Sequence, residues 1–219
     1  MVGMRVESGV ASLKVRAVVT QALLALFLLV TVLVSLGTLM LAVQEIQTGY
    51  SAYLITLPVY SLYIAMAFLP AAIALTFWTW RAHANLHEDA LDELNYSPAW
   101  AAMSLWVPIL NLYTPKGATR ELWNRSHGED AWFAQQSVDA VNSWWTCYVV
   151  GILLVSLLTA IVIIDRITPF MFLTPPGTNM LAMAFSTSLL AGSAWFLIRI
   201  VGRITHAQET VTSVGDTFA

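Results

Sequence analysis

His83 and His87 are four residues apart, and the carboxylates of Glu88 and Asp89 follow them. On a helix this spacing places both imidazoles on one face, where a nearby carboxylate could complete a divalent-metal site. The alternative is a polar helix that follows an apolar segment, with both histidines solvated or hydrogen-bonded to lipid headgroups. We favour this alternative because the chain has only four histidines, whereas a catalytic zinc needs three protein ligands and further supporting hydrogen bonds. We therefore expect no cofactor.

Four carboxylates follow closely in the same stretch: Glu88, Asp89, Asp92 and Glu93. They could bind a cation or a basic partner surface. Such a run is more often the solvated face of an amphipathic helix, and here the opposite face would carry Leu86, Ala90 and Leu94. We favour the solvated face.

The uncharged segment 97–115 contains a third candidate site. Its Ser-Pro pair at 97–98 and its Thr-Pro pair at 114–115 are signals for a helix start, so the segment predicts two short helices. Pro108 removes a backbone donor between them, and Asn111 adds a polar side chain near the break. Backbone groups freed by the break could hold a lipid headgroup or a small molecule. The alternative is that Asn111 caps the broken turn.

The composition defines the class of protein that must position these residues. The chain of 219 residues is 58% hydrophobic and only 11% charged, and its mean hydropathy is +0.70, which indicates an integral membrane protein. A formal net charge of −3 leaves no basic excess for nucleic-acid binding. The single cysteine, Cys147, excludes an intrachain disulfide and a thiolate metal cage. No phosphate-binding loop or nucleophile motif stands out, so we expect no enzyme.

Four uncharged stretches are long enough to cross a hydrocarbon core, which takes about 20 helical residues. We expect membrane spans at about 17–43, 59–80, 140–164 and 178–198. None of these spans contains a charged residue. Because charges inside the membrane are typical of proton relays and ion paths, this pattern argues against a pump or an ion-coupled transporter.

The remaining apolar segment, 97–115, decides the topology. If it crossed the membrane, the ten Lys and Arg residues would be divided equally between the two sides. If it dips in and returns, or lies in the interface, nine of the ten are on one side, as the positive-inside rule requires. We therefore predict an all-α integral membrane protein with a bundle of four transmembrane helices plus a proline-bracketed re-entrant or in-plane helical element. It comprises a cytoplasmic segment 1–16, a single membrane domain 17–207 and a polar tail 208–219, with both termini cytoplasmic.

The same segment carries three motifs: Tyr-Ser-Pro-Ala-Trp at 96–100, Trp-Val-Pro-Ile-Leu-Asn-Leu-Tyr-Thr-Pro at 106–115 and Arg-Glu-Leu-Trp at 120–123. They resemble the SPxW start, the W-x-P-x-x-N-L-x-x-P centre and the RE-x-W close of the bacterial membrane family of domain of unknown function 4328 (DUF4328). Further positions that look like family features are Asn85-Leu86, Trp144-Trp145, Arg203-Ile204-Thr205 and Gln208. The stretch 117–119 is smaller and more polar than the family pattern. The resemblance implies a multi-span membrane domain and no particular activity.

The motifs supply the candidate contact or ligand residues, which are Ser97, Pro98, Trp100, Trp106, Pro108, Asn111, Pro115, Arg120, Glu121 and Trp123. Our leading hypothesis is a non-enzymatic accessory, scaffold or interaction subunit of the bacterial inner membrane. It would act through the lipid bilayer and through a protein partner or self-association. The second hypothesis is a binder or transporter of a lipid or small molecule, with its site at Pro108 and Asn111. The third is a metal-dependent membrane enzyme at His83 and His87.

Overall fold

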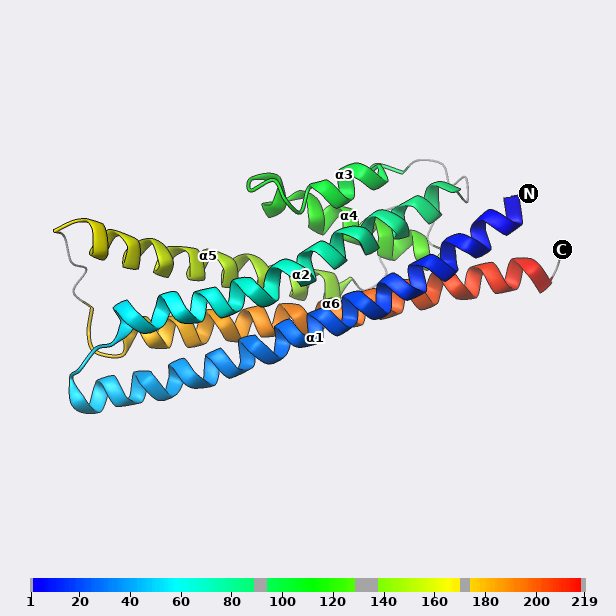
Figure 1. Ribbon diagram of the computed structural model, residues 1–219. Helices are drawn as coiled ribbons and strands as arrows, with labels where there is room; N and C mark the ends of the chain where they lie inside the picture. The colour runs from blue at the N-terminus through cyan, green and yellow to red at the C-terminus, as the bar shows by residue number, and fades with distance from the viewer. Residues whose placement is uncertain (1, 89–93, 129–137, 170–173, 218–219) are drawn as a thin grey trace. The chain divides into compact units, whose positions relative to one another are not determined.

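The computed structural model describes residues 2–88, 94–128, 138–169 and 174–217, and their regular structure is helical. Four helices are long and apolar enough to cross a membrane: α1 (Val2–Thr48), α2 (Tyr53–Glu88), α5 (Asp139–Ile167) and α6 (Thr178–Thr217). Three short helices separate α2 from α5: α3 (Pro98–Met103), the 3-10 helix η1 (Leu110–Leu112) and α4 (Thr114–Ser126). Figure 1 shows these elements. The predicted all-α protein with four membrane-spanning helices is confirmed.

The long helices extend beyond the predicted spans. α1 begins at Val2 and ends at Thr48, because the next residue, Gly49, adopts a left-handed φ of +71° that a glycine tolerates at a helix end. α6 likewise continues to Thr217, through most of the predicted polar tail. The predicted apolar spans therefore lie within longer helices.

α2 begins at Tyr53 rather than near residue 59, so Pro58 lies inside the helix. A proline has no N–H, and it leaves the carbonyl four residues earlier without its helical partner. Here that carbonyl belongs to Leu54, and it accepts a hydrogen bond from the guanidinium of Arg166. A side chain from α5 thus replaces the backbone bond that Pro58 cannot make, and the helix starts earlier than the proline predicts.

The chain divides into two compact units. Unit 1 comprises Met1–Leu24, Pro70–Ser143 and Phe196–Ala219, and its core includes Trp78, Leu122 and Ile204. Unit 2 comprises Ala25–Leu69 and Trp144–Trp195, and its core includes Leu57, Met183 and Leu190.

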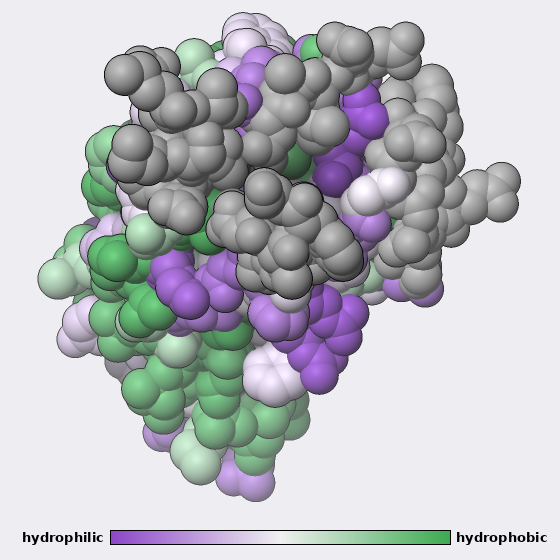
Figure 2. Space-filling model, turned by 90° about the vertical axis from the view of Figure 1, so that its right-hand side faces the viewer, coloured by the Kyte–Doolittle hydropathy of each residue, from purple (hydrophilic) through white to green (hydrophobic). Residues whose placement is uncertain are grey.

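Large apolar side chains also cover the outside of the molecule. Leu33, Met66 and Leu157 in unit 2 are each more than half exposed, and Figure 2 shows green, hydrophobic side chains over much of the lower part of its view. Exposed apolar surface on long helices suits contact with lipid, where the helix satisfies its own backbone groups.

Unit 1 contains all three short helices, and both α3 and η1 pack against α4. In α3, the Ser97 side chain accepts from Trp100 N–H at 3.3 Å and caps the helix as predicted. The second predicted cap is wrong: Tyr113 occupies the cap position without a side-chain bond, and Thr114 is already helical. Segment 97–115 contains helices of 6 and 3 residues before α4 begins, too short for the about 20 residues that a crossing needs.

Candidate functional site

Glu121 joins the two ends of the proline-bracketed region. Its side chain is fully buried and accepts hydrogen bonds from Asn95 N at 2.8 Å, Asn95 Nδ2 at 2.9 Å and Tyr96 N at 3.2 Å. A carboxylate can leave water only when several donors replace its hydration. These three bonds supply such donors and fix the chain that enters α3 against α4.

Tyr96 packs directly on α4 at Gly117. A Cβ added to Gly117 would lie 2.3 Å from the Tyr96 hydroxyl oxygen, so no larger residue fits without displacing the ring. Burial, and then the negative charge of Glu121, raises the pKa of the Tyr96 phenol. The small residues at 117–119, which depart from the family pattern, therefore have a packing reason at their first position.

Trp106 ties the middle of the segment to α2. Its indole Nε1 donates to Thr76 Oγ1 at 2.8 Å. Around this bond the chain exposes five further apolar or aromatic side chains by 43% to 74%: Trp100, Met103, Val107, Ile109 and Tyr113. Residues 97–115, which we call the proline element, are thus attached to the unit and leave an uncharged apolar surface uncovered.

Asn111 lies half-buried in η1. Its backbone N–H donates to Val107 O at 2.7 Å and closes the turn that contains the exposed Pro108. The turn is thus closed by the backbone of Asn111, and a capping or ligand-binding role for its side chain stays a prediction. Pro115 is buried at the start of α4, and Arg120 is half-buried beside Glu121.

Gln208 links three helices of unit 1. Its Nε2 donates to Ala82 O of α2 at 3.2 Å and to Ser126 Oγ of α4 at 3.0 Å. Its Oε1 accepts from Asn85 Nδ2 at 2.9 Å. All of these side chains are buried. Gln208 therefore joins α2, α4 and α6 through hydrogen bonds.

The two histidines do not form a metal site with other described residues. His83 is fully buried, and in the described part of the chain neither ring nitrogen has a hydrogen-bond partner. The ring Nδ1 of His87 lies 2.9 Å from the backbone oxygen of His83. Among the residues that the structure describes, no three His, Cys, Asp or Glu side chains are placed to hold a metal ion. The described residues therefore do not supply the three ligands that a catalytic zinc requires.

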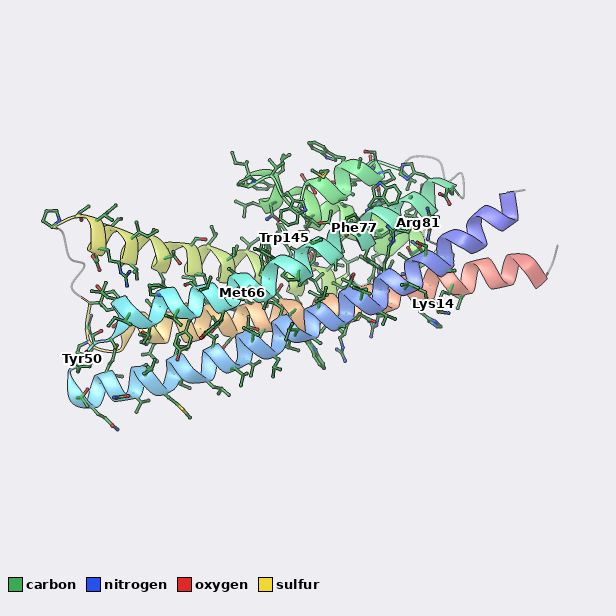
Figure 3. The ribbon with its side chains drawn as sticks, viewed as in Figure 1. Lys14, Tyr50, Met66, Phe77, Arg81 and Trp145 are labelled. Atoms are coloured by element: carbon green, nitrogen blue, oxygen red, sulfur yellow. The ribbon has the colours of Figure 1, made fainter. Side chains whose placement is uncertain are left out.

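Most of the acidic stretch lies outside the described residues, including Asp89, Asp92 and Glu93. Its first member, Glu88, forms a two-bond ion pair with Arg81 at 2.8 and 3.1 Å. Arg81, labelled in Figure 3 near Phe77 on α2, also donates from Nε to Gly9 O of α1 at 3.4 Å. Glu88 therefore holds Arg81 in place.

A family model described as "Domain of unknown function (DUF4328)" matches residues 54–206. The chain belongs to this family. No curated protein matches it, and no solved structure matches it either. The family resemblance predicted from the motifs is thus confirmed, and it brings no activity with it.

The motif residues of this DUF4328 member have distinct structural positions. Ser97, Glu121 and Trp106 hold the proline element. Trp123 is buried and stacks on His127, with ring centroids 4.8 Å apart. Near the end of the matched range, Thr205 accepts from Trp78 Nε1 at 3.1 Å. The motif therefore describes the scaffold of unit 1 more than a shared ligand pocket.

Sequence reasoning missed a second buried carboxylate, Glu45 in unit 2. Its Oε1 accepts from Ser51 Oγ and Ala52 N, both at 3.0 Å, and its Oε2 accepts from Gly177 N at 3.1 Å. These bonds join the α1–α2 and α5–α6 connections. The sequence did offer one indication of this role, because Glu45 is the one acidic residue between Glu7 and Glu88.

Proposed function

We propose that this DUF4328 protein is a non-enzymatic accessory protein of the bacterial inner membrane that presents the proline element to another integral membrane protein. One observation carries the proposal: the polar motif side chains bond to their own scaffold, while the apolar side chains of the proline element stay exposed. A catalytic site would be expected to show the reverse, with polar groups converging on a pocket.

The bond between Trp106 and Thr76 supports a re-entrant position for the element. Thr76 lies five residues before Arg81, the first charge after the apolar part of α2. At about 1.5 Å per helical residue, Thr76 is about 7 Å deeper in the membrane than Arg81. The element reaches this depth through Trp106 and then returns to the charged helix α4.

The backbone at this depth favours a protein partner over lipid as the cover. Val107, Pro108 and Ile109 are exposed and lie outside regular helix. Irregular backbone within the hydrocarbon is tolerated only where protein or a water-filled cavity covers it, because lipid offers no hydrogen bonds. The five exposed side chains are uncharged, so the matching surface on the partner is apolar.

Topology is the first test. In a Cys147→Ser background, we expect a maleimide that does not cross membranes to label Tyr50→Cys from outside the cell. We expect it to label Lys116→Cys and Ala11→Cys only after the cytoplasmic side is opened. Labelling of Lys116→Cys together with Tyr50→Cys from outside would mean that residues 97–115 cross the membrane, and the proposal would be wrong.

The second test asks what covers the element. A photo-crosslinking amino acid is placed at Ile109, which is 74% exposed, or at the matched control Leu157, which is 57% exposed on α5. In native membranes we expect Ile109 to give one discrete protein adduct and Leu157 to give lipid adducts. Lipid adducts at both positions would contradict the partner. An adduct of twice the chain's mass would show that a second copy of this chain covers the element, and the proposal of a different partner protein would be wrong.

A further inference from the structure

A cavity of about 360 Å³ lies in unit 1 between the end of α4 and the C-terminal part of α6. Ser126, His127 and Gly128 line it from the end of α4, and Arg203, His206 and Thr210 line it from α6. The Thr210 hydroxyl already donates to Ala207 O at 2.8 Å. The Arg203 guanidinium, the His206 ring and the Ser126 hydroxyl can donate hydrogen bonds into the space, which therefore suits an anion.

The groups at this cavity are positioned by stacking. The Arg203 guanidinium carbon lies 6.0 Å from the centre of the Trp123 ring, and the His127 ring stacks on the same indole at 4.8 Å. A cation over an indole is attracted by its ring electrons. Trp123 is buried, so a fixed ring orients both an arginine and a histidine at the cavity.

His127 also removes a repulsion that an anion would otherwise meet. The carbonyls at the end of a helix carry partial negative charge. Here Trp123 O accepts from His127 N at 3.2 Å and lies 2.7 Å from His127 Nδ1. A carbonyl oxygen can only accept, so Nδ1 carries the ring proton and occupies this carbonyl, and Nε2 is left as an acceptor.

One acidic residue beside the cavity is paired with a lysine. Glu209 lies between the lining residues His206 and Thr210, and its carboxylate is 3.3 Å from Lys14 Nζ of α1. That ion pair offsets the charge that Glu209 brings near Arg203. Glu129 and Asp130, which follow Gly128 in the sequence, lie outside the described residues.

The position of Arg203 along α6 indicates the source of the anion. It lies five residues beyond Ile198, where the predicted apolar span ends. At about 1.5 Å per residue, the guanidinium begins about 7 Å outside the hydrocarbon. That depth is the headgroup layer, because headgroups add roughly 5–7 Å on each side of a core of about 30 Å.

We propose that this cavity binds the phosphate of an anionic phospholipid headgroup from the cytoplasmic leaflet. Arg203 supplies the charge, the ring of His206 supplies a donor, and the hydroxyl of Ser126, which accepts from Gln208, can donate its own proton. The site is separate from the proline element, and it requires no protein partner.

The test uses the purified full chain and native mass spectrometry with added phosphatidylglycerol or phosphatidylcholine. We expect one phosphatidylglycerol to bind more tightly than phosphatidylcholine. Arg203→Gln should weaken that binding by about fivefold or more, the effect of one basic group near an anionic lipid, and His206→Ala should also weaken it, because it removes a ring donor. The matched control is Arg199→Gln, one turn earlier on α6 and outside the cavity lining, which should leave the binding unchanged.

Two outcomes would overturn the site. Equal losses in Arg203→Gln and Arg199→Gln would mean a diffuse surface charge effect, and no difference between the two lipids would mean no anion site. Glycerol phosphate that displaces the lipid completely at equal concentration would show that a soluble phosphate is the ligand and that the lipid source is wrong. If Arg203→Gln fails to fold, His206→Ala alone decides, since His206 is exposed on α6, and unchanged binding in that variant would overturn the site.

Discussion

Each of the two units contains a buried carboxylate, and a comparison of the two shows how buried charge holds the connections between helices. Glu121 in unit 1 is fully buried, and Glu45 in unit 2 is 4% exposed. Each accepts three hydrogen bonds, two of them from backbone N–H groups in connections between helices. Backbone donors outside helices need partners when they are buried. In both units a single glutamate therefore serves as the acceptor that holds a connection.

The two carboxylates differ in what they join. Glu121 bonds to Asn95 and Tyr96, about two dozen positions earlier, and thus holds a local element. Glu45 bonds to Ala52 and to Gly177, which are 7 and 132 positions away. Glu121 is part of a recognisable motif, whereas Glu45 is only an isolated acidic residue in the sequence, and its partners are known only from the folded chain.

The largest effect is expected from Glu121→Ala. It removes a fully buried carboxylate and the three hydrogen bonds that this carboxylate accepts, and a hydrogen bond to a charged group contributes about 1.5–3 kcal/mol. We expect a loss of about 3 kcal/mol in the free energy of unfolding, measured by thermal or denaturant unfolding in detergent. Glu121→Gln keeps one acceptor oxygen and should lose less. A Glu121→Ala protein as stable as the native chain would mean that this carboxylate holds nothing.

Glu45→Ala should follow closely, with a loss of about 2–3 kcal/mol. It leaves the buried N–H of Gly177 without its acceptor, whereas Ser51 is exposed and can bond to water instead. The same unfolding measurement checks it, with Glu45→Gln as the control. A loss greater than that of Glu121→Ala would reverse the comparison between the two units.

Gly177→Ala sharpens the comparison by testing the partner of Glu45. Gly177 has a φ of +82°, and an added Cβ would lie 2.9 Å from Ala42 O. Gly49 has a φ of +71° with nothing within 4 Å of such a Cβ, so it is a matched control for backbone strain alone. We expect a loss of about 1 kcal/mol for Gly49→Ala and clearly more for Gly177→Ala in unfolding experiments. Equal losses would mean that the close approach at Gly177 has no energetic effect.

The smallest effect is expected where the proline element meets α2. Trp106→Phe and Thr76→Val each remove the same hydrogen bond, and such bonds between membrane helices contribute about 0.6 kcal/mol. A double-mutant cycle in unfolding experiments should give a coupling energy of about that size. Additive losses would show that the two side chains do not interact and would remove the depth argument for the element.

The sequence by itself determined the fold class and the family. Long uncharged runs require helices in lipid, so the four spanning helices follow from hydropathy alone. The cap at Ser97 followed from local chemistry, because a serine before a proline offers its oxygen to the first turn. The motif around segment 97–115 identified the region in which Glu121 and Trp106 form hydrogen bonds that hold the proline element.

The tertiary structure decided what distant residues do. The predicted span 59–80 begins after Pro58, but α2 already starts at Tyr53, because Arg166 of another helix supplies the hydrogen bond that Pro58 cannot make. Arg203 and Gln208 look like family positions in the sequence, and Glu45 is isolated there, but the contacts of all three depend on partners that are brought near only by folding. Local sequence patterns predict helices and their caps, because these depend on neighbouring residues. Hydrogen bonds between segments far apart in the chain depend on the fold, so no local pattern predicts them.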